Sequence, residues 1–515
     1  MIYDVAVVGL GPCGAVATAL LGRSGVATFA FDKAHAVYDR PRAVAIDHEI
    51  LRVFQQIGLM DRIQPWIAPA TETEYYGVDG QLIRRDVDID PPHPLGYPPS
   101  VVFAQPAVET VLRQRLGELD PITLSWAEEL VDLEQHDGCV SLRLRNEQGA
   151  ERTVQARYVI GCDGAASSVR QLLGIDLEDL EFNEPWLVAD VLLNQSGLAK
   201  APKLSTQYCE PSRPCWYIVG VGHHRRWQFA INPGEDPARL ETAEATSQLL
   251  SRWIAPEDGE LLRHAAYRFR GLVAAEWRRG RVFIAGDAAH QQPPYLGQGL
   301  CQGIRDVANL VWKLTSVLNG QLTGALLDTY GAERREHVRQ FTSRLKAIGG
   351  SMFDRDLNRA RARDARLLAE STGTVAATRR QSLQPRLARG LLSMNEHPAN
   401  GTVFPQPWLL GDGARRRFDD VFGYGWRLVL KEDVDEIRVP KALRARLGLS
   451  QIWIGSDRKG IHEAEEVLAD WFHRNACSAA VVRPDHYVYG VATGPLDGVA
   501  IFADLETHIT EGPIG

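Results

Sequence analysis

Three turns rich in glycine or acidic residues each follow an apolar stretch, and they hold the residues best suited to chemistry. The first reads Gly9-Leu10-Gly11-Pro12-Cys13-Gly14 and comes directly after the apolar stretch 3–8. This G-x-G-x-x-G spacing between a strand and a helix is typical of dinucleotide binding. Gly9 permits a tight turn, Gly11 lets the backbone approach a pyrophosphate, and Gly14 lets the helix pack closely on the sheet. The helix start adds free N–H groups and partial positive charge for phosphate.

An acidic residue follows at the distance that one strand–helix–strand unit requires. The second strand is predicted over 26–31 and ends at Asp32, whose carboxylate can accept hydrogen bonds from ribose hydroxyls. Acid here favours an unphosphorylated adenosine ribose, as in FAD or NAD, and Lys33 beside it is a further predicted contact. A glycine-rich turn without a nucleotide is the structural alternative. This motif alone leaves FAD versus NAD(P) open.

A second acidic turn lies much further along the chain. The predicted strand 281–285 leads into Gly286-Asp287-Ala288-Ala289-His290, where small residues let the chain pass close to a ligand. Asp287 could accept hydrogen bonds from ribityl hydroxyls. Pro293-Pro294 and Gly297-Gln298-Gly299-Leu300 follow, before a helix with apolar residues on one face. Gly297 and Gly299 leave backbone N–H groups unobstructed, where they can face the electron-rich edge of an isoalloxazine.

A third turn lies between these two. The predicted strand 158–161 ends in Cys162-Asp163-Gly164. Asp163 could contact a pyrophosphate through water or a backbone amide. An ordinary strand-to-helix cap is an equally open interpretation of this turn.

Bulk properties restrict the kind of protein that carries these turns. At 515 residues the chain exceeds the roughly 250 to 300 residues at which one core stops growing, so several domains are expected. A net charge of −8 disfavours nucleic acid as a partner. No apolar run reaches the ~18 residues of a membrane span and no signal peptide is present, which predicts a cytoplasmic protein without a membrane partner. The seven cysteines form no Cys-x-x-Cys pair, which predicts reduced thiols and no metal site.

The pattern of elements predicts an α/β fold. Residues 1–180 and 272–345 fit the two parts of a Rossmann-type nucleotide-binding domain, with substrate-side strands near 71–104. The inserted region 181–271 breaks the helix–strand alternation with strand-like stretches at 187–193, 216–221 and 227–231. This predicts a mixed-sheet substrate domain laid over the cofactor as a lid that excludes water.

Aromatic and basic residues are candidates for substrate chemistry. A tyrosine or histidine could take the proton of a phenol and make its ring more nucleophilic, and an arginine could hold a carboxylate. Tyr217 is the first choice for this proton transfer, with Tyr208 and Arg213 as substrate contacts. Asp47 and His48 are further pocket candidates, His48 as a catalytic residue. For each, the alternative is that aromatic residues belong to the core and arginines face water.

Together the turns resemble a known family. In order and spacing, 9–14, Asp163-Gly164 with Arg170, and Gly286-Asp287 resemble the fingerprints of single-component (class A) FAD-dependent aromatic hydroxylases, the para-hydroxybenzoate hydroxylase and phenol hydroxylase group. Finer features over about 1–345 resemble the 3-(3-hydroxyphenyl)propionate hydroxylase-like enzymes. These features are Arg40-Pro41-Arg42-Ala43-Val44, Gln105-Pro106, Gly297-Gln298-Gly299-Leu300-Cys301 with Arg305-Asp306, and Leu327-Asp328-Thr329-Tyr330 with Glu333-Arg334.

The resemblance implies FAD as the cofactor and adds site residues. Arg42 and Gln105 would contact the flavin, Asp163 the pyrophosphate side and Asp287 the ribityl chain or pyrophosphate. Pro294 would neighbour the reacting flavin face, which places it among the predicted catalytic residues. NADH or NADPH would bind only transiently, since the chain has one good nucleotide fold.

The C-terminal region is predicted as a linker and a further domain. Residues 346–398 are rich in Arg, Ala and Leu and predict a helical linker, and a Pro and Gly cluster over 398–413 marks a boundary. Strands are expected at 426–430, 451–454, 479–483 and 488–491, with a helix near 464–473. By resemblance, 399–515 form a thioredoxin-like domain. Without a Cys-x-x-Cys motif, a role in folding or in a homodimer contact is expected.

The implied activity is hydroxylation of a phenolic substrate, ortho to an existing hydroxyl, with NAD(P)H and O2 through a flavin C4a-hydroperoxide. An FAD-dependent reductase, a dehydrogenase or a Baeyer–Villiger-type oxygenase on the same scaffold remains an alternative. A binding protein without turnover is another. A halogenase is disfavoured because none of the twelve tryptophans begins a Trp-x-Trp-x-Ile-Pro pattern.

Overall fold

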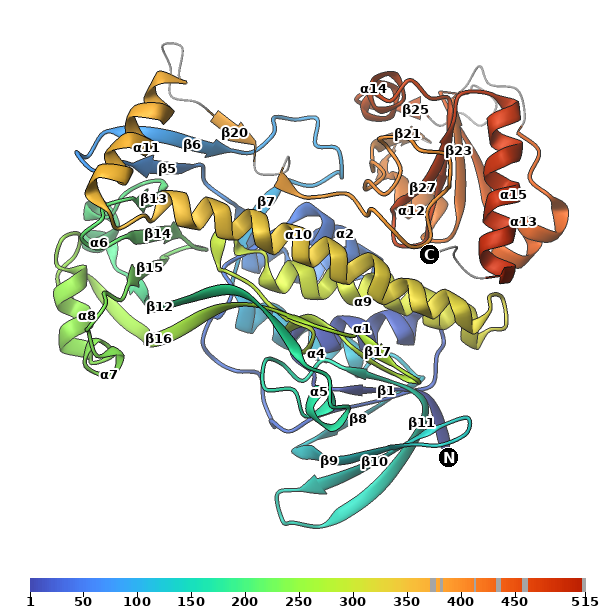
Figure 1. Cartoon of the computed structure of the whole chain (residues 1–515), viewed down its shortest axis with the longest axis horizontal. Coiled ribbons are helices and arrows are strands. Elements are labelled where there is room, and N and C mark those ends of the chain that lie inside the picture. Colours follow the sequence, from blue (N-terminus) through green and yellow to red (C-terminus); the bar gives the residue numbers. More distant parts are fainter. Residues whose placement is uncertain (371–376, 380–382, 412–413, 432–436, 456–461, 512–515) are drawn as a thin grey trace.

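The computed structural model describes residues 1–370, 377–379, 383–411, 414–431, 437–455 and 462–511. Two large sheets lie on either side of a helical layer that contains α1, α9 and α10, and a smaller C-terminal sheet lies beside the helices (Figure 1). The turns singled out in the sequence all open toward the space between the two large sheets.

The first sheet brings these turns together at one edge. Its strands run in the order β17-β18-β11-β1-β2-β8, with β9 and β10 as a hairpin beside β11. Val8, Gly161 and Ile284 are cross-strand neighbours at the ends of three parallel strands, so the turns that follow them lie side by side. The bounds are β1 Ile2–Val8, β2 Thr28–Asp32, β8 Ile122–Trp126, β9 Glu128–Gln135, β10 Val140–Asn146, β11 Glu151–Gly161, β17 Arg278–Arg279 and β18 Val282–Ile284. The strands predicted at 3–8, 158–161 and 281–285 are confirmed, and the second strand begins at Thr28 instead of residue 26.

Helix α1 (Pro12–Arg23) is apolar nearly all round because it is covered on several sides. Its residues 14–22 are buried, and it packs against α4 (Gln105–Leu116) and α9 (Gly299–Leu318). The short helices α2 (His48–Gln56), α3 (Met60–Ile63) and α5 (Ser168–Leu172) complete this part. A small sheet of β3 (Ala45–Asp47), β7 (Ser100–Phe103) and β4 (Ile67–Pro69) lies beside them.

The second sheet has nine strands in the order β19-β16-β12-β15-β14-β13-β5-β6-β20. Its bounds are β5 Thr73–Tyr76, β6 Leu82–Val87, β12 Leu177–Leu193, β13 Ser205–Tyr208, β14 Cys215–Val219, β15 His224–Ala230, β16 Gly259–Ala274, β19 His290–Gln291 and β20 Ala377–Arg379. The predicted strands 187–193, 216–221 and 227–231 correspond to β12, β14 and β15. The long strands β12 and β16 pair along most of their length. Helices α6 (Gln195–Lys200), α7 (Pro237–Leu240) and α8 (Ala243–Leu250) belong to the same region.

Two helices, α10 (Asp328–Met352) and α11 (Leu357–Ala369), lead toward the C-terminal part. The predicted linker 346–398 is therefore helical at its start, but β20 interrupts it, and 371–376 and 380–382 lie outside the described residues. A sheet in the order β24-β23-β26-β27 follows, with a smaller sheet β22-β21-β25. The bounds are β21 Trp408–Gly411, β22 Ala414–Arg417, α12 Phe418–Phe422, β23 Arg427–Lys431, α13 Lys441–Leu447, β24 Ser450–Ile454, β25 His462–Glu463, α14 Val467–Arg474, β26 Ala479–Val482, β27 Val488–Ala492 and α15 Pro495–Glu511. The four strands and the helix predicted here are all present.

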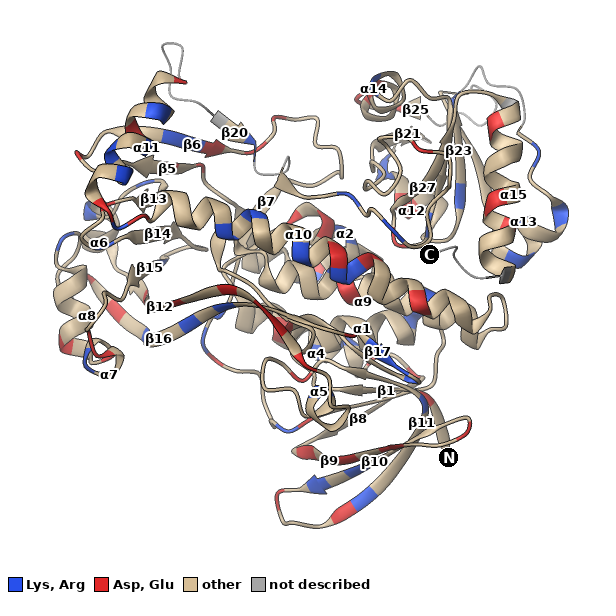
Figure 2. Cartoon of the chain, in the orientation of Figure 1, with Lys and Arg blue, Asp and Glu red and all other residues tan. Residues whose placement is uncertain are grey.

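Charged residues of both signs are mixed over the molecule (Figure 2). On the hairpin β9–β10, Arg143 pairs with Asp132 and Arg145 with Glu129 across neighbouring strands. Among the described residues, no helix combines the length and hydropathy of a membrane span, and no group of three or more His, Cys, Asp or Glu side chains is arranged to hold a metal. All seven cysteines are free thiols.

Candidate active site

The glycines after β1 meet two different physical demands. Gly9 has a φ of 90°, and a Cβ there would lie 2.7 Å from the carbonyl oxygen of Cys162. A Cβ on Gly14 would lie 1.9 Å from the carbonyl oxygen of Gly9. A Cβ on Gly11 would meet no atom within 4 Å, and Gly11, Pro12 and Cys13 line a cavity. Gly9 and Gly14 therefore close the turn, while Gly11 leaves bare backbone at the start of α1.

Asp32 braces this turn from the end of β2. Its Oδ2 accepts a hydrogen bond from the Leu10 N–H at 2.6 Å, and its Oδ1 accepts one from Ala34 at 2.8 Å. The carboxylate thus holds the glycine turn against the neighbouring strand. Lys33 is exposed, and neither Asp32 nor Lys33 is among the described residues that line the cavity.

Asp163 supports the start of α5, where Ser167 is the N-cap residue. Its carboxylate accepts hydrogen bonds from the Ser167 hydroxyl at 2.5 Å and the Val169 N–H at 3.1 Å, at the start of α5. Arg170 donates to the backbone carbonyls of Ala288 at 2.9 Å and Ala165 at 3.0 Å, which ties this turn to the Asp287 turn. The cavity is lined by Cys162, Gly164 and Ala165 on either side of Asp163.

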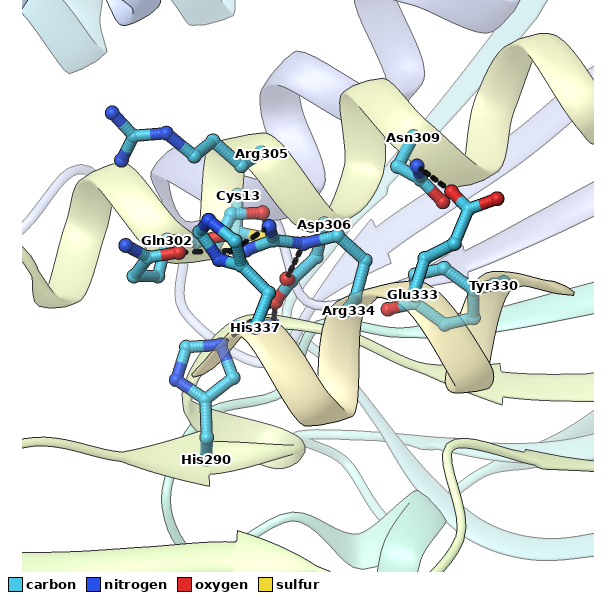
Figure 3. A network of polar contacts seen from close by, with 12 residues as sticks. Cys13, His290, Gln302, Arg305, Asp306, Asn309, Tyr330, Glu333, Arg334 and His337 are labelled. Atoms are coloured by element: carbon cyan, nitrogen blue, oxygen red, sulfur yellow. Dashed lines mark hydrogen bonds and ion pairs between the residues drawn. The ribbon is translucent and has the colours of Figure 1, made fainter. Parts of the chain in front are cut away.

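The Asp287 turn rests on a buried polar network between α9 and α10 (Figure 3). Asp306 accepts hydrogen bonds from the Gly286 N–H at 3.0 Å, from His290 Nε2 at 2.7 Å and from Arg334 Nε at 2.9 Å. The neighbouring carboxylate of Asp287 opens onto the cavity and has no hydrogen bond or ion pair with any described residue. Its carboxylate is accessible from the cavity, and desolvation by the surrounding protein raises its pKa. The carboxylate of Asp287 can therefore accept a hydrogen bond from a hydroxyl group of a ligand in the cavity.

Arg42 is held at the cavity by its backbone. The Gln105 side-chain oxygen accepts from the Arg42 N–H at 3.0 Å and from the Ala43 N–H at 2.5 Å, while the Gln105 amide donates to Glu109 at 2.6 Å. The Arg42 guanidinium is half-exposed and lies 3.6 Å from Glu109. Gln105 thus positions the Arg42 segment, and the guanidinium is available for phosphate.

A buried charge cluster in the second sheet holds the same segment from the other side. Arg226 donates to both carboxylate oxygens of Asp190, at 2.7 and 2.9 Å, and to the backbone carbonyls of Arg42 at 2.6 Å and Pro41 at 2.7 Å. Arg263 also donates to the Pro41 carbonyl at 2.5 Å. Asp190 is not among the residues predicted from the sequence, although an acid within the apolar stretch 187–193 is a signal that could have identified it.

The segment before α9 completes the cavity wall. Pro294, Gly297, Gly299 and Leu300 all line the cavity. Leu296 and Gly297 have φ values of 63° and 67°, and a side chain at Gly299 would meet no atom within 4 Å. Backbone groups here are open to a ligand.

These residues fit FAD. They surround a cavity of about 530 Å³, within the range of cofactor sites. Bare backbone at Gly11 and a half-exposed Arg42 suit the pyrophosphate, while the unpaired carboxylate of Asp287 suits ribityl hydroxyls. Bare backbone at Gly297 and Gly299 suits the electron-rich edge of the flavin ring.

One face of the second sheet forms the opposite wall. Cross-strand pairs place Tyr75, Gln207, Trp216 and Gln228 in one row across β5, β13, β14 and β15, and all four line the cavity. The row is buried. The indole N–H of Trp216 and the amide oxygen of Gln228 have no hydrogen-bond partner in the described part of the chain. None of these four residues is among the site residues predicted from the sequence.

The predicted substrate residues of this sheet lie elsewhere. Tyr217 is fully buried on the other face, where its hydroxyl donates to the Pro202 carbonyl at 3.0 Å and its ring packs on Trp227. Tyr208 contacts the Trp253 ring and lines a separate cavity, and Arg213 pairs with Glu235. The assignment of Tyr217 to proton transfer, and of Tyr208 and Arg213 to substrate contacts, is therefore contradicted. Successive side chains of a strand point to opposite faces, and Tyr208 and Tyr217 lie on the face away from the cavity, while Arg213 lies in the turn between β13 and β14.

Asp47 and His48 line a second cavity, of about 380 Å³, next to the C-terminal part. Asp47 caps α2 and forms an ion pair with Arg305 at 2.5 Å, so its carboxylate already has partners. His48 Nδ1 has no partner among the described residues, and burial lowers its pKa to about 4. The structure does not bring either residue to the wall of the first cavity. Leu296 and Gln298 line both cavities, so the segment before α9 lies between them.

Comparison with known proteins identifies the class. The chain belongs to the FAD-binding-domain family of class A flavoprotein hydroxylases, whose model matches residues 2–345, and a model described as the HcaD C-terminal domain matches 401–500. The chain is 33% identical over 522 residues to a probable NADH-specific resorcinol 4-hydroxylase of Rhodococcus jostii (strain RHA1), covering 99% of this chain and 96% of that protein. It is 33% identical over 516 residues to a 3-(3-hydroxy-phenyl)propionate/3-hydroxycinnamic acid hydroxylase of Burkholderia cenocepacia (strain HI2424), covering 94% and 93%.

Solved structures share the fold. The flavin-dependent monooxygenase PieE, in complex with FAD and substrate, has a TM-score of 0.84 at 21% identity over 100% of both chains. Aklavinone-11 hydroxylase, in a ternary complex with FAD and aklavinone, has a TM-score of 0.79 at 21% identity over 98% of both chains. The resemblance inferred from the three turns is confirmed, and FAD is the cofactor of this family. When bound, the reduced flavin of such an enzyme supplies an electrophilic oxygen atom derived from O2.

Proposed function

We propose that this enzyme hydroxylates a small phenol that carries a second polar group, with NADH and O2 as co-substrates. The observation that carries the proposal is the pairing of two walls around one cavity. One wall has the flavin-binding turns, and the other has a buried row of aromatic and amide side chains. A reductase or dehydrogenase would not require this second wall, whereas a hydroxylase needs it to exclude water.

The unpaired polar atoms on the second wall indicate the kind of substrate. The Trp216 indole can donate a hydrogen bond and the Gln228 amide oxygen can accept one, and both side chains are more than nine-tenths buried. Leaving such groups unpaired costs about 1–3 kcal/mol each, so a ligand that satisfies them binds preferentially. A phenol with a second hydroxyl or a carboxylate side chain has suitable groups.

The relatives support the choice of co-substrate and position. One is named as NADH-specific, which favours NADH over NADPH here. Position 4 of resorcinol is adjacent to a ring hydroxyl, which agrees with hydroxylation ortho to an existing hydroxyl.

A screen of the purified yellow protein tests this function. NADH oxidation would be followed with resorcinol, phenols with carboxylate side chains and phenols with neither group, and products would be identified by mass. We expect faster turnover and a product heavier by one oxygen atom with the first two groups. Oxidation of NADH that no aromatic compound accelerates would contradict the proposal.

We further propose a three-part architecture. Residues 1–180 and 272–345 would form the FAD-binding domain, 181–271 the inserted substrate domain and 399–515 a thioredoxin-like domain. The sheet order β24-β23-β26-β27, with β23 parallel to β24 and antiparallel to β26, supports the last assignment. The homodimer is likewise a proposal, and light scattering of the purified protein would test it.

A further inference from the structure

Tyr75, Asp86 and Arg84 form a buried chain of hydrogen bonds at the wall of the flavin cavity. The Tyr75 hydroxyl donates to Asp86 Oδ2 at 2.5 Å. The other carboxylate oxygen of Asp86 accepts from Arg84 Nε at 2.8 Å and lies 2.7 Å from a second guanidinium nitrogen of Arg84. Tyr75 and Asp86 are both 1% exposed, and both line the cavity. A buried ion pair thus lies one hydroxyl group away from the substrate side of the cavity.

The strand register shows why these residues face the cavity. Tyr75 is the cross-strand neighbour of Arg84 on β6 and of Gln207 on β13. Gln207 donates to the Tyr75 hydroxyl at 3.4 Å and is itself part of the cavity wall. The adjacent Tyr76 points to the opposite face, where its hydroxyl donates to Glu74 at 2.9 Å and it lines another cavity. Neighbouring tyrosines on one strand therefore have different surroundings.

The direction of the hydrogen bonds restricts what Tyr75 can do for a ligand. Its hydroxyl hydrogen is directed to the carboxylate of Asp86, so toward the cavity the Tyr75 oxygen acts as an acceptor. A substrate hydroxyl that meets it must donate its hydrogen. This arrangement suits a phenol whose proton has to leave.

We propose that Tyr75 and Asp86 are catalytic residues that relay the phenolic proton of the substrate during hydroxylation. The inference rests on the proposed function. As the ring carbon bonds to the electrophilic oxygen, electron density leaves the phenolic oxygen and its O–H becomes strongly acidic. The substrate O–H bond breaks and an O–H bond forms at Tyr75, while the former Tyr75 proton passes to Asp86. Electrons and protons balance, since Asp86 ends as a neutral carboxylic acid and the substrate has lost one proton.

Arg84 has a positioning role in this relay. It holds Asp86 through two nitrogens and lies over the Tyr75 ring with 5.1 Å between guanidinium carbon and ring centroid. Its guanidinium therefore fixes the position of the carboxylate that takes the proton from Tyr75.

The test compares Tyr75→Phe with Tyr76→Phe across phenols of increasing acidity. Tyr76→Phe is the matched control, because it removes the same hydroxyl from the same strand on the other face. We expect Tyr75→Phe to lower kcat about 100-fold for weakly acidic phenols, with the loss falling below about 5-fold for a nitrophenol that is already ionised at the assay pH. Asp86→Asn should show the same pattern, and Tyr76→Phe should match the parent.

Two further readouts separate proton transfer from structural damage. Bound FAD per chain shows whether the variants fold, and the visible absorbance of bound nitrophenol reports its ionisation directly. An equal loss with all phenols, or no loss, would overturn the relay while leaving the proposed function intact. A parent enzyme that hydroxylates none of the phenols would overturn both.

Discussion

At the scale of single residues, two carboxylates at the same turn differ in their hydrogen bonding. Asp306 accepts three hydrogen bonds from the protein, whereas Asp287 has none within the described residues and faces the cavity. We predict that Asp287→Ala weakens FAD binding about 10-fold or more, because the ligand hydroxyls lose a charged acceptor. Asp287→Asn keeps an acceptor oxygen and should have a smaller effect. Flavin fluorescence during titration of the apoprotein measures both, and tight FAD binding by Asp287→Ala would refute this role.

We predict that the buried side chain of His48 makes the free energy of unfolding depend on pH. Burial lowers its pKa to about 4 from an ordinary value near 6.5, against the opposite pull of Asp47 and Glu49. The folded chain binds this proton less tightly than the unfolded chain, so stability falls as the pH decreases from about 6.5 to about 4. In His48→Gln this part of the decrease, up to about 3 kcal/mol, should disappear. Urea unfolding of both proteins at several pH values measures the difference, and parallel curves would contradict the prediction.

At the scale of elements, the turn between β1 and α1 offers a matched pair of substitutions. Gly14→Ala places a methyl group 1.9 Å from the Gly9 carbonyl oxygen, whereas Gly11→Ala places it in open space. We expect Gly14→Ala to destabilise the fold by about 1–3 kcal/mol or more. Gly11→Ala should unfold like the parent but bind FAD more weakly, because its methyl group occupies the cavity. Thermal unfolding of the apoproteins distinguishes them, and equal midpoints would contradict the assignment of the two glycines.

Turn chemistry made the flavin side of the site predictable from sequence, while the substrate side was not. Gly9 and Gly11 were predicted from the spacing within one turn, and Asp287 from the small residues around it in another turn. Such predictions succeed because a tight turn and a helix start depend on local residues. On the substrate side, the sequence led to Tyr217 as the catalytic residue, but its neighbour Trp216 is the residue that lines the cavity. Alternation along a strand separates two faces but does not say which one meets the cofactor, since that depends on pairing with distant strands such as β5. The sequence likewise did not decide whether the Asp163 carboxylate supports the start of a helix or contacts the pyrophosphate, since this also depends on distant parts of the chain.

At the scale of the whole molecule, a buried ion cluster joins α9 and α10 to the C-terminal part. Arg483 donates to Glu333 at 2.7 and 3.0 Å and to Asp485 at 2.6 Å, and Lys313 donates to Glu333 at 2.8 Å. Burial alone would raise the pKa of Glu333, but Arg483 and Lys313 lower it to about 2. The cluster is therefore charged at neutral pH and holds the two regions in one arrangement.

Removing one member of this cluster should destabilise the whole chain. We predict that Arg483→Met costs about 3–5 kcal/mol, because Glu333 and Asp485 lose their main counter-charge in a buried site. Arg415→Met is the control, since Arg415 pairs with Glu465 at the surface and should cost less than about 1 kcal/mol. Urea unfolding followed by tryptophan fluorescence suits this test, because the Arg483 guanidinium lies 5.6 Å from the Trp312 ring centroid. Similar midpoints for the two variants would show that the cluster does not stabilise this junction.

We expect the cavity between the two sheets to hold FAD and the phenol together and to keep water away from them during turnover. Turnover of the best phenolic substrate under ¹⁸O2, with NADH consumption and product mass measured together, tests it most directly. We predict one ¹⁸O atom in each product molecule and one NADH consumed for each product. Product without the label, or NADH oxidation that yields only hydrogen peroxide with every phenol, would contradict the account.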